Sequence, residues 1–211
     1  DALRRAILRG DLVAGERVPQ VVWADRLGVS TTPVREALRD LATEGMVQLD
    51  AHRGACVTRL TYEQVCEIYR IRQTLEPAAL RDAARLITPV TLARAERLHR
   101  ALVEQTDLGR WTELHCELHD TLLGDLRSQR MLVTVTSLRD NVSAYVSAVL
   151  RRQGVVRPHG EHRDLLDAMH AHDGDRATDI ALRHLASTVA VLRYDHAAQG
   201  DNSQQPVLTA S

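Results

Sequence analysis

The spacing of hydrophobic residues along the chain changes near residue 60. Between residues 2 and 59, short apolar runs are separated by turn residues, whereas residues 61 to 197 carry apolar positions three and four apart over long stretches. The second spacing is typical of amphipathic helices. The pattern predicts a mainly α protein with two parts, whose boundary falls at residues 58 to 61.

The second part is predicted to be an all-α antiparallel helical bundle. Thr61 and Gln64 have the spacing of a capping box before its first helix. Thr88 and Pro89 supply an N-cap and a first-turn proline for its second helix. The expected helices cover residues 62–87, with a kink at Pro77, then 88–105, 108–126, 129–152, 159–171 and 174–197.

The polar stretch after the last predicted helix contains Pro206 and few apolar residues. Such a composition is typical of disorder. We therefore expect a domain at residues 1–60, a second domain at residues 61–198 and a disordered tail at residues 199–211.

Residues 21–27 and 32–41 are predicted to form two short helices joined by a turn that contains Gly28. This is the layout of a helix-turn-helix. Thr32 can cap the second helix and Pro33 can begin it, and its apolar face can enter a core. Arg35 and Arg39 then lie on the opposite face, where a guanidinium can bind phosphate or guanine in the major groove.

Two short alternating runs, residues 46–49 and 55–58, flank the turn at residues 50–54. They predict a small β-hairpin with His52 and Arg53 at its tip, where both can reach the DNA backbone or the minor groove. A hairpin directly after a helix-turn-helix indicates a winged helix-turn-helix domain that binds double-stranded DNA.

The amino-acid composition constrains the core and the cellular location of the protein but does not indicate its function. The chain has 211 residues, 44% of them hydrophobic but only 3% aromatic, so its core must consist of aliphatic side chains, which suits helices. A net charge of −1 neither supports nor excludes DNA binding. The three cysteines lack the spacing of a disulfide framework or a cysteine zinc site, and no membrane span or signal peptide is visible. We expect a cytoplasmic protein.

Four of the ten histidines form a candidate metal site. His115 and His119 are four residues apart and share one helix face, while His162 and His184 fall in the last two predicted helices. Imidazoles that converge from three helices would suit zinc or nickel. The alternative is that the His115 and His119 pair is an ordinary surface or hydrogen-bonded feature.

The N-terminal residues resemble the DNA-binding domain of GntR-family regulators. The resemblance is carried by residues 3–12, by Leu27-Gly28-Val29-Ser30, by Thr32-Pro33-Val34-Arg35-Glu36-Ala37-Leu38 and by Arg53-Gly54. It implies DNA contacts by Ser30, Thr31, Thr32, Arg35, Arg39, His52, Arg53 and Gly54. Two positions depart from the pattern, because Thr31 and Val21 stand where members of the family carry arginine. We expect these changes to weaken phosphate contact or alter the operator sequence that is read.

The helical part resembles the FCD effector domain of the FadR subfamily. The matching segments include residues 71–76, Leu118-His119, residues 161–168 and Arg183-His184-Leu185. The resemblance implies that His119, His162 and His184 are metal ligands and that His115 stands at an Asp or Asn ligand position. Either His115 is a fourth ligand, or three ligands leave open positions for water or the effector. It also implies a small organic acid as effector, whose carboxylate can complete the metal shell.

Arg72 matches a position from which the resemblance implies contact with the effector carboxylate. An ion pair with Glu76 within the same helix is the alternative for Arg72. The other histidines with a stated expectation are predicted to lie at the surface; they are His99, His159, His170, His172 and His196.

These features together predict a transcription repressor that binds operator DNA as a homodimer and is controlled by a small organic acid. One alternative is a metal-dependent hydrolase or oxygenase that uses the histidine cluster. Glu117 argues against it, because it follows His115 by two residues rather than one and so leaves the ligand face. The other alternative is a dimeric DNA-binding protein that binds no ligand.

Overall fold

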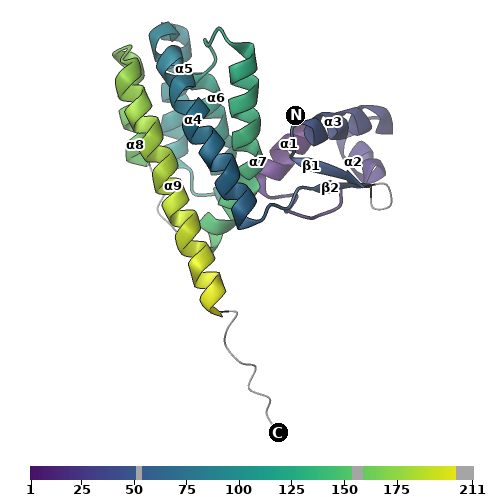
Figure 1. Cartoon of the computed structure of the whole chain (residues 1–211). Helices are drawn as coiled ribbons and strands as arrows, with labels where there is room; N and C mark the ends of the chain where they lie inside the picture. The colour runs from purple at the N-terminus through teal and green to yellow at the C-terminus, as the bar shows by residue number, and fades with distance from the viewer. Residues whose placement is uncertain (51–53, 154–158, 203–211) are drawn as a thin grey trace.

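The computed structural model describes residues 1–50, 54–153 and 159–202, and it confirms the mainly α fold. The elements are α1 (Ala2–Arg9), α2 (Gln20–Leu27), α3 (Thr31–Thr43), β1 (Val47–Asp50), β2 (Gly54–Val57), α4 (Tyr62–Leu86), α5 (Pro89–Glu104), α6 (Leu108–Leu122), α7 (Gln129–Gln153), α8 (His159–His170) and α9 (Gly174–Asn202). Figure 1 shows α1 to α3 and the hairpin as one part beside the bundle of α4 to α9. No helix in the described ranges is long and apolar enough to cross a bilayer.

Helices α2 and α3 form the predicted helix-turn-helix. The turn begins at Gly28, whose φ of 64° lies in the left-handed region that favours glycine. Val34, Leu38 and Leu41 bury one face of α3. The predicted cap at Thr32 is wrong, because Ser30 is the N-cap and α3 begins at Thr31. Pro33 still lies in the first turn, where backbone N–H groups have no partner within the helix.

Strands β1 and β2 form the predicted hairpin, with Val47 opposite Val57 and Asp50 opposite Gly54. A bridge between Arg17 and Cys56 extends the pairing. The predicted tip residues His52 and Arg53 lie outside the described residues.

The bundle begins as its sequence predicts. The backbone N–H of Gln64 donates to Thr61 Oγ1 at 3.3 Å, and the N–H of Thr61 donates to Gln64 Oε1 at 2.9 Å, which completes the capping box. Thr88 caps α5, with Pro89 as its first residue. Helix α4 continues through Pro77 to Leu86 and packs along α9 (Figure 1). Fully buried side chains from several helices make the core; they include Leu80, Leu102, Leu118, Leu122, Leu166, Met169 and Ile180.

Two predicted helix ends are wrong. Helix α6 ends at Leu122 rather than residue 126, because the chain turns at Gly124 while Leu123 and Leu126 remain buried in the core. Helix α9 continues to Asn202, beyond the predicted start of the tail at residue 199. Its last turns are held by Asp195, which accepts hydrogen bonds from Arg152, Gln153 and Gln199. Residues 203–211 lie outside the described residues.

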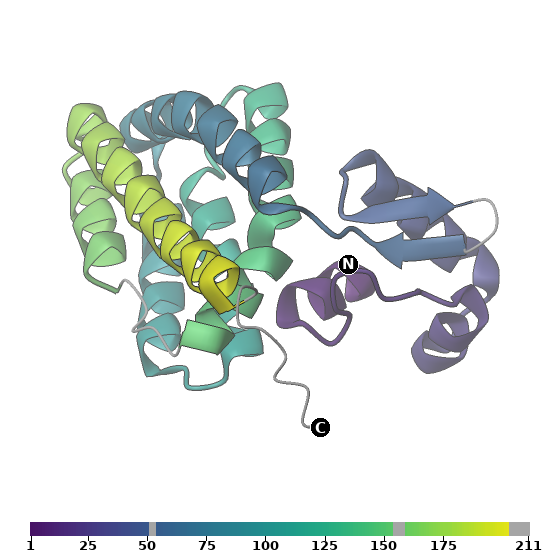
Figure 2. The same cartoon turned by 60° about the horizontal axis from the view of Figure 1, so that its bottom comes forward.

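Helix α1 joins the two parts. It packs against α6 and α7, and Figure 2 shows it between the hairpin and the bundle. Arg4 pairs with Asp140 of α7 at 2.6 Å, and Arg9 pairs with Glu113 of α6 at 3.0 Å. Cys116 of α6 packs into the same apolar cluster as the helix-turn-helix core. The two helices that carry much of the candidate site therefore also carry the N-terminal part.

Candidate metal and effector site

The structure brings the four predicted histidines together at the centre of the bundle. His115 and His119 come from successive turns of α6, His162 from α8 and His184 from α9. One ring nitrogen from each lies within 4.8 Å of the other three. Residue spacing alone could pair only the two histidines on α6, and the packing of α8 and α9 against the rest of the bundle completes the cluster.

The nitrogen spacing fits a tetrahedral metal ion. Four imidazole nitrogens held about 2.0 to 2.1 Å from a zinc ion lie about 3.3 Å from one another. The Nε2 atoms of His119 and His162 are 3.3 Å apart, and the other donor pairs lie within 4.8 Å. A set of four neutral nitrogen ligands suits zinc or nickel rather than calcium or magnesium, which prefer oxygen. These four residues would therefore hold the metal, which would tie three helices together.

Burial keeps the cluster in the form that binds metal. His119 and His162 are almost fully buried, and burial holds the pKa of His115 and His119 well below its usual range. The neighbouring imidazoles and the Arg139 charge lower the pKa of both residues further. Neutral imidazole is the form that coordinates a metal, since a protonated ring has no free lone pair.

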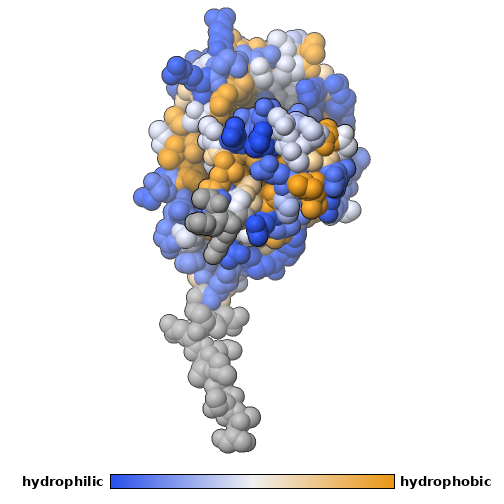
Figure 3. Space-filling model, turned by 90° about the vertical axis from the view of Figure 1, so that its right-hand side faces the viewer, coloured by the Kyte–Doolittle hydropathy of each residue, from blue (hydrophilic) through white to orange (hydrophobic). Residues whose placement is uncertain are grey.

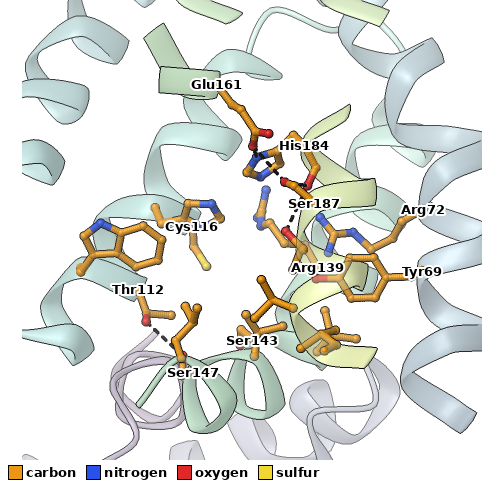
Figure 4. Close-up of a pocket in the computed structure, with 18 residues that line it drawn as sticks. Tyr69, Arg72, Thr112, Cys116, Arg139, Ser143, Ser147, Glu161, His184 and Ser187 are labelled. Carbon is orange, nitrogen blue, oxygen red and sulfur yellow. Dashed lines mark hydrogen bonds and ion pairs between the residues drawn. The ribbon is translucent and has the colours of Figure 1, made fainter. Parts of the chain in front are cut away.

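Glu161 orients one of the four histidines. His184 Nδ1 lies 2.8 Å from Glu161 Oε2, and Ser187 donates to the same oxygen at 3.2 Å (Figure 4). The hydrogen bond from His184 lowers the pKa of the Glu161 carboxyl. With its proton held on Nδ1, His184 has a lone pair on Nε2 for the cluster. A carboxylate in this role is common around metal-binding histidines.

A cavity of about 240 Å³ borders the cluster, with His115 and His184 on its wall. In Figure 4, Thr112 and Cys116 lie on one side of the cavity, and Tyr69 and Arg72 lie on the other. Trp111 also lines the cavity. Typical ligand pockets measure roughly 300 to 1,000 Å³. The cavity is therefore suited to a small molecule.

Arg72 lines this cavity but is already paired. Its Nε and Nη2 atoms lie 3.0 and 2.9 Å from Glu76 Oε2, and its guanidinium lies 4.8 Å from the ring centre of Tyr69. Both members of the pair are buried. The contact within α4 that the sequence left as the alternative is thus present, and the role of Arg72 in binding a carboxylate stays a prediction.

Sequence reasoning missed most residues of the cavity wall, and two of them stand out. Arg139 of α7 is buried between Cys116 and Arg72, and Trp111 stacks on His115 with ring centres 4.9 Å apart. Arg139 and Asp140 interrupt the apolar pattern of α7, and this interruption was the available signal.

One expectation for the remaining histidines is wrong. His99 was predicted at the surface but is only 8% exposed, because it lies on the core side of α5. His170, His172 and His196 are exposed as predicted, and the side chain of His159 lies outside the described residues.

The predicted DNA-reading residues lie on the exposed side of the helix-turn-helix. Ser30, Thr31 and Thr32 are exposed around the start of α3, and Gly54 is exposed in β2. Arg35 and Arg39 are also exposed, and neither has an ion-pair partner among residues 1–50, 54–153 and 159–202. Figure 3 shows this side of the molecule as a mixture of hydrophilic and hydrophobic areas. The exposed apolar side chains of this part are Val13, Val21, Val22, Leu27, Val29 and Leu49.

Glu117 takes no part in the histidine cluster. Its carboxylate pairs with Arg94 of α5 at 2.9 Å, so it faces away from the four rings. A metal-dependent hydrolase would need an acid or base beside the metal. The position of Glu117 therefore agrees with the sequence argument against such an enzyme.

Known proteins match both parts of the chain. Residues 1–57 match the family model "Bacterial regulatory proteins, gntR family", and residues 67–187 match the FCD domain. The chain is 30% identical over 204 residues to the HTH-type transcriptional repressor RspR of Escherichia coli, covering 92% of this chain and 88% of that protein. It is 29% identical over 178 residues to the Nta operon transcriptional regulator of Aminobacter aminovorans, covering 81% of each.

Solved structures have the same fold. McbR/YncC of E. coli is 23% identical, with a TM-score of 0.78 over 92% of this chain and 95% of that one. A GntR-family regulator from Pseudomonas syringae pv. tomato is 28% identical, with a TM-score of 0.61 over 95% of this chain and 85% of that one. The matching proteins are transcription regulators and not enzymes. The chain is a member of the GntR family of bacterial transcription regulators, and its gntR-family segment is followed by an FCD domain.

Proposed function

We propose that this regulator is a homodimeric repressor of the FadR subfamily whose operator affinity is controlled by a small organic acid. In this proposal a divalent metal, zinc or nickel, occupies the four-histidine cluster, and the acid binds in the adjoining cavity. The observation that carries the proposal is that helices α6 and α7 supply part of the cavity wall and also carry helix α1 of the DNA-binding part.

Helix α3 supports the DNA-binding half of the proposal. Its buried side holds it in the domain core, so Arg35 and Arg39 face outward with their donors available. An arginine can bind two acceptors of guanine at once in the major groove. Thr31, exposed in the first turn, is a further position for contact with bases or phosphates.

The cavity supports control by a ligand over a purely structural role for the bundle. A dimerisation module has no need of a buried cavity whose wall contains two arginines and two histidines. Such a ligand changes DNA affinity only if it binds the DNA-competent and incompetent arrangements unequally. Coupling of this kind amounts to about 1 to 3 kcal/mol in typical cases.

The proposed dimer explains how two recognition helices reach one operator. Twofold symmetry would place the two α3 helices on half-sites of a pseudo-palindrome about 34 Å apart. A regulator of this kind would act in the cytoplasm, where the bacterial chromosome is.

The test begins with duplex DNA selected by the full-length protein from a random pool. We expect Arg35→Ala to weaken binding to the selected duplex about 5- to 150-fold, because one bidentate base contact is worth about 1 to 3 kcal/mol. Arg127→Ala, a change at an exposed arginine in the turn between α6 and α7, serves as the control and should leave affinity unchanged.

The dimer is checked on the same samples by light scattering. Both variants should remain dimeric, since neither residue lies in a core of the described structure. Undiminished binding by Arg35→Ala at physiological salt would contradict the proposed recognition helix.

A further inference from the structure

A second cavity lies between the N-terminal part and the bundle. Its volume is about 400 Å³, which is within the range of typical ligand pockets. The loop after α1 and residues 58–60, which connect β2 to α4, form one side of it. Helix α7 and Gln199 of α9 form the other side. A molecule bound in this cavity would therefore touch both parts of the chain.

Helix α7 separates this cavity from the one beside the histidines. The α7 residues on the wall of the second cavity recur at helical spacing; they include Asn141, Ala144, Tyr145, Ala148, Arg151 and Arg152. The α7 residues on the wall of the histidine cavity follow a different face; they include Arg139, Val142, Ser143, Val146 and Leu150. Among the described residues, Ser147 alone borders both cavities. The second cavity is thus a site of its own.

The wall of the second cavity is positively charged. Arg59, Arg151 and Arg152 line it, and no acidic side chain in the described part of the chain does so. Arg152 is neutralised by Asp195, whose carboxylate it binds at 2.6 Å. Arg59 and Arg151 have no ion-pair partner within residues 1–50, 54–153 and 159–202. Two of the three positive charges therefore remain available to a ligand.

Two glycines let these arginines lie against the loop after α1. A Cβ atom added at Gly10 would lie 3.1 Å from Nη2 of Arg151, and one added at Gly15 would lie 3.0 Å from Nε and Nη2 of Arg59. The Nη2 atom of Arg59 also donates to the carbonyl of Ala14 at 3.3 Å. The loop thus positions one guanidinium group from residues 58–60 and one from α7 at a common cavity.

We propose that this cavity binds a small phosphate-bearing metabolite, and that Arg59 and Arg151 bind its phosphate group. A phosphate monoester carries about two negative charges and three terminal oxygens, so it can accept hydrogen bonds from two guanidinium groups of different elements. A carboxylate offers two oxygens in one plane, which suits a single arginine. This ligand is additional to the metal and the organic acid of the proposed function.

The cavity lies beside contacts that hold the recognition helix. Asn141 lines the cavity, and a Cβ atom added at Gly45, in the turn after α3, would lie 3.0 Å from its Nδ2 atom. One turn earlier in α7, Ser137 donates to the carbonyl of Glu44, the C-cap residue of α3, at 3.1 Å. A phosphate held by both Arg59 and Arg151 ties residues 58–60 to α7. It therefore binds different arrangements of the two parts unequally, which is the requirement for control of DNA binding.

The binding test is isothermal titration of the full-length protein with glucose 6-phosphate, gluconate and glucose. Low ionic strength is used, because salt screens exposed charges. We expect glucose 6-phosphate to bind more tightly than gluconate, and glucose, which has no charge, not to bind. Arg59→Gln and Arg151→Gln should each weaken glucose 6-phosphate binding about tenfold. This loss is near the lower end for a hydrogen bond to a charged group, because both arginines are exposed to water.

Arg130→Gln is the matched control, because Arg130 is an exposed arginine of α7 that is not on the cavity wall. It should keep the affinity of the wild type. Arg151→Lys keeps the charge and should recover part of the affinity that Arg151→Gln loses, which a folding defect would not explain. The proposal would be overturned by no binding of glucose 6-phosphate, by gluconate binding at least as tightly, by unchanged affinity in either Gln variant at the cavity, or by an equal loss in the control.

Fluorescence anisotropy with the selected duplex tests the link to DNA binding. Glucose 6-phosphate at a concentration that saturates the wild type should change duplex affinity at least about fivefold, the lower limit of typical coupling. It should not change the duplex affinity of the double variant Arg59→Gln/Arg151→Gln. An unchanged affinity in the wild type would overturn the regulatory role of the cavity. Without glucose 6-phosphate, a loss of duplex affinity in the double variant as large as that of Arg35→Ala would mean that these arginines bind the DNA backbone, and it would overturn the proposal.

Discussion

The contact between α1 and α6 can be tested at a single glycine. Gly109 is the second residue of α6, and a Cβ atom added there would lie 2.7 Å from the carbonyl oxygen of Arg9. Ordinary contact for a Cβ begins at 3.4 Å, so Gly109→Ala forces the two helices several tenths of an ångström apart. Both atoms in this contact belong to the backbone or sit directly on it, so no side-chain rotation can relieve it.

The magnitude follows from two opposing effects. Overpacking of a close contact costs about 1 to 3 kcal/mol, and alanine in place of glycine in a helix gains up to about 1 kcal/mol. Because the 2.7 Å approach lies far inside ordinary contact, the cost falls at the upper end of its range, and we expect Gly109→Ala to lower the free energy of unfolding by about 2 kcal/mol. The displacement would also strain the pair between Arg9 and Glu113, which buries the Glu113 carboxylate.

The matched control is Gly160→Ala. Gly160 is the second residue of α8, and an added Cβ there meets no atom within 4 Å. Chemical unfolding at one fixed protein concentration should show this variant to be as stable as the wild type or slightly more so. If Gly109→Ala were equally stable, α1 could not lie against α6 as described, and the route from the cavity to the DNA-binding part would be lost.

Three further predictions concern the bundle and its site. Leu166→Ala should lower the free energy of unfolding by about 2 to 5 kcal/mol in denaturant titrations, because Leu166 is fully buried and its truncation leaves a cavity. A loss of unfolding free energy no larger than that of a typical surface substitution would contradict this packing. Glu161→Gln should weaken zinc affinity about 10- to 100-fold in competition with a chelator, because His184 loses its charged partner; unchanged affinity would remove Glu161 from the site. Asp195→Asn should destabilise the protein near neutral pH by about 1 to 3 kcal/mol. The hydrogen bond from Arg152 lowers the Asp195 pKa, so this contribution is present above the usual aspartate pKa and is lost as pH falls through the lowered value; a difference between the two proteins that persists in acid would contradict it.

Local sequence signals predicted most of the fold. Capping at Thr61 and Thr88 depends on residues three positions apart, so it is visible without the tertiary structure. The two wrong helix ends depended on distant contacts instead. Helix α9 extends past Gly200 because Asp195 binds residues of α7, and no pattern within α9 itself reveals that partner.

The candidate site likewise combines residues that local spacing predicted with residues that only distant contacts bring together. The spacing of His115 and His119 placed them on one helix face, and family resemblance supplied His162 and His184 from distant helices. The pairing of Arg72 with Glu76 was a visible alternative because the two residues are four apart. The place of Arg139 in the cavity wall was hidden, since its neighbours there come from other helices that are distant in sequence.

We propose above that the four histidines bind one divalent metal at the centre of the FCD domain. Native mass spectrometry of the protein purified from zinc-supplemented medium tests it most directly. The account predicts one zinc ion per chain in the wild type and in His170→Ala, which changes an exposed histidine of the same helix α8, and none in His162→Ala. Wild-type protein without metal, or zinc retained in full by His162→Ala, would contradict it.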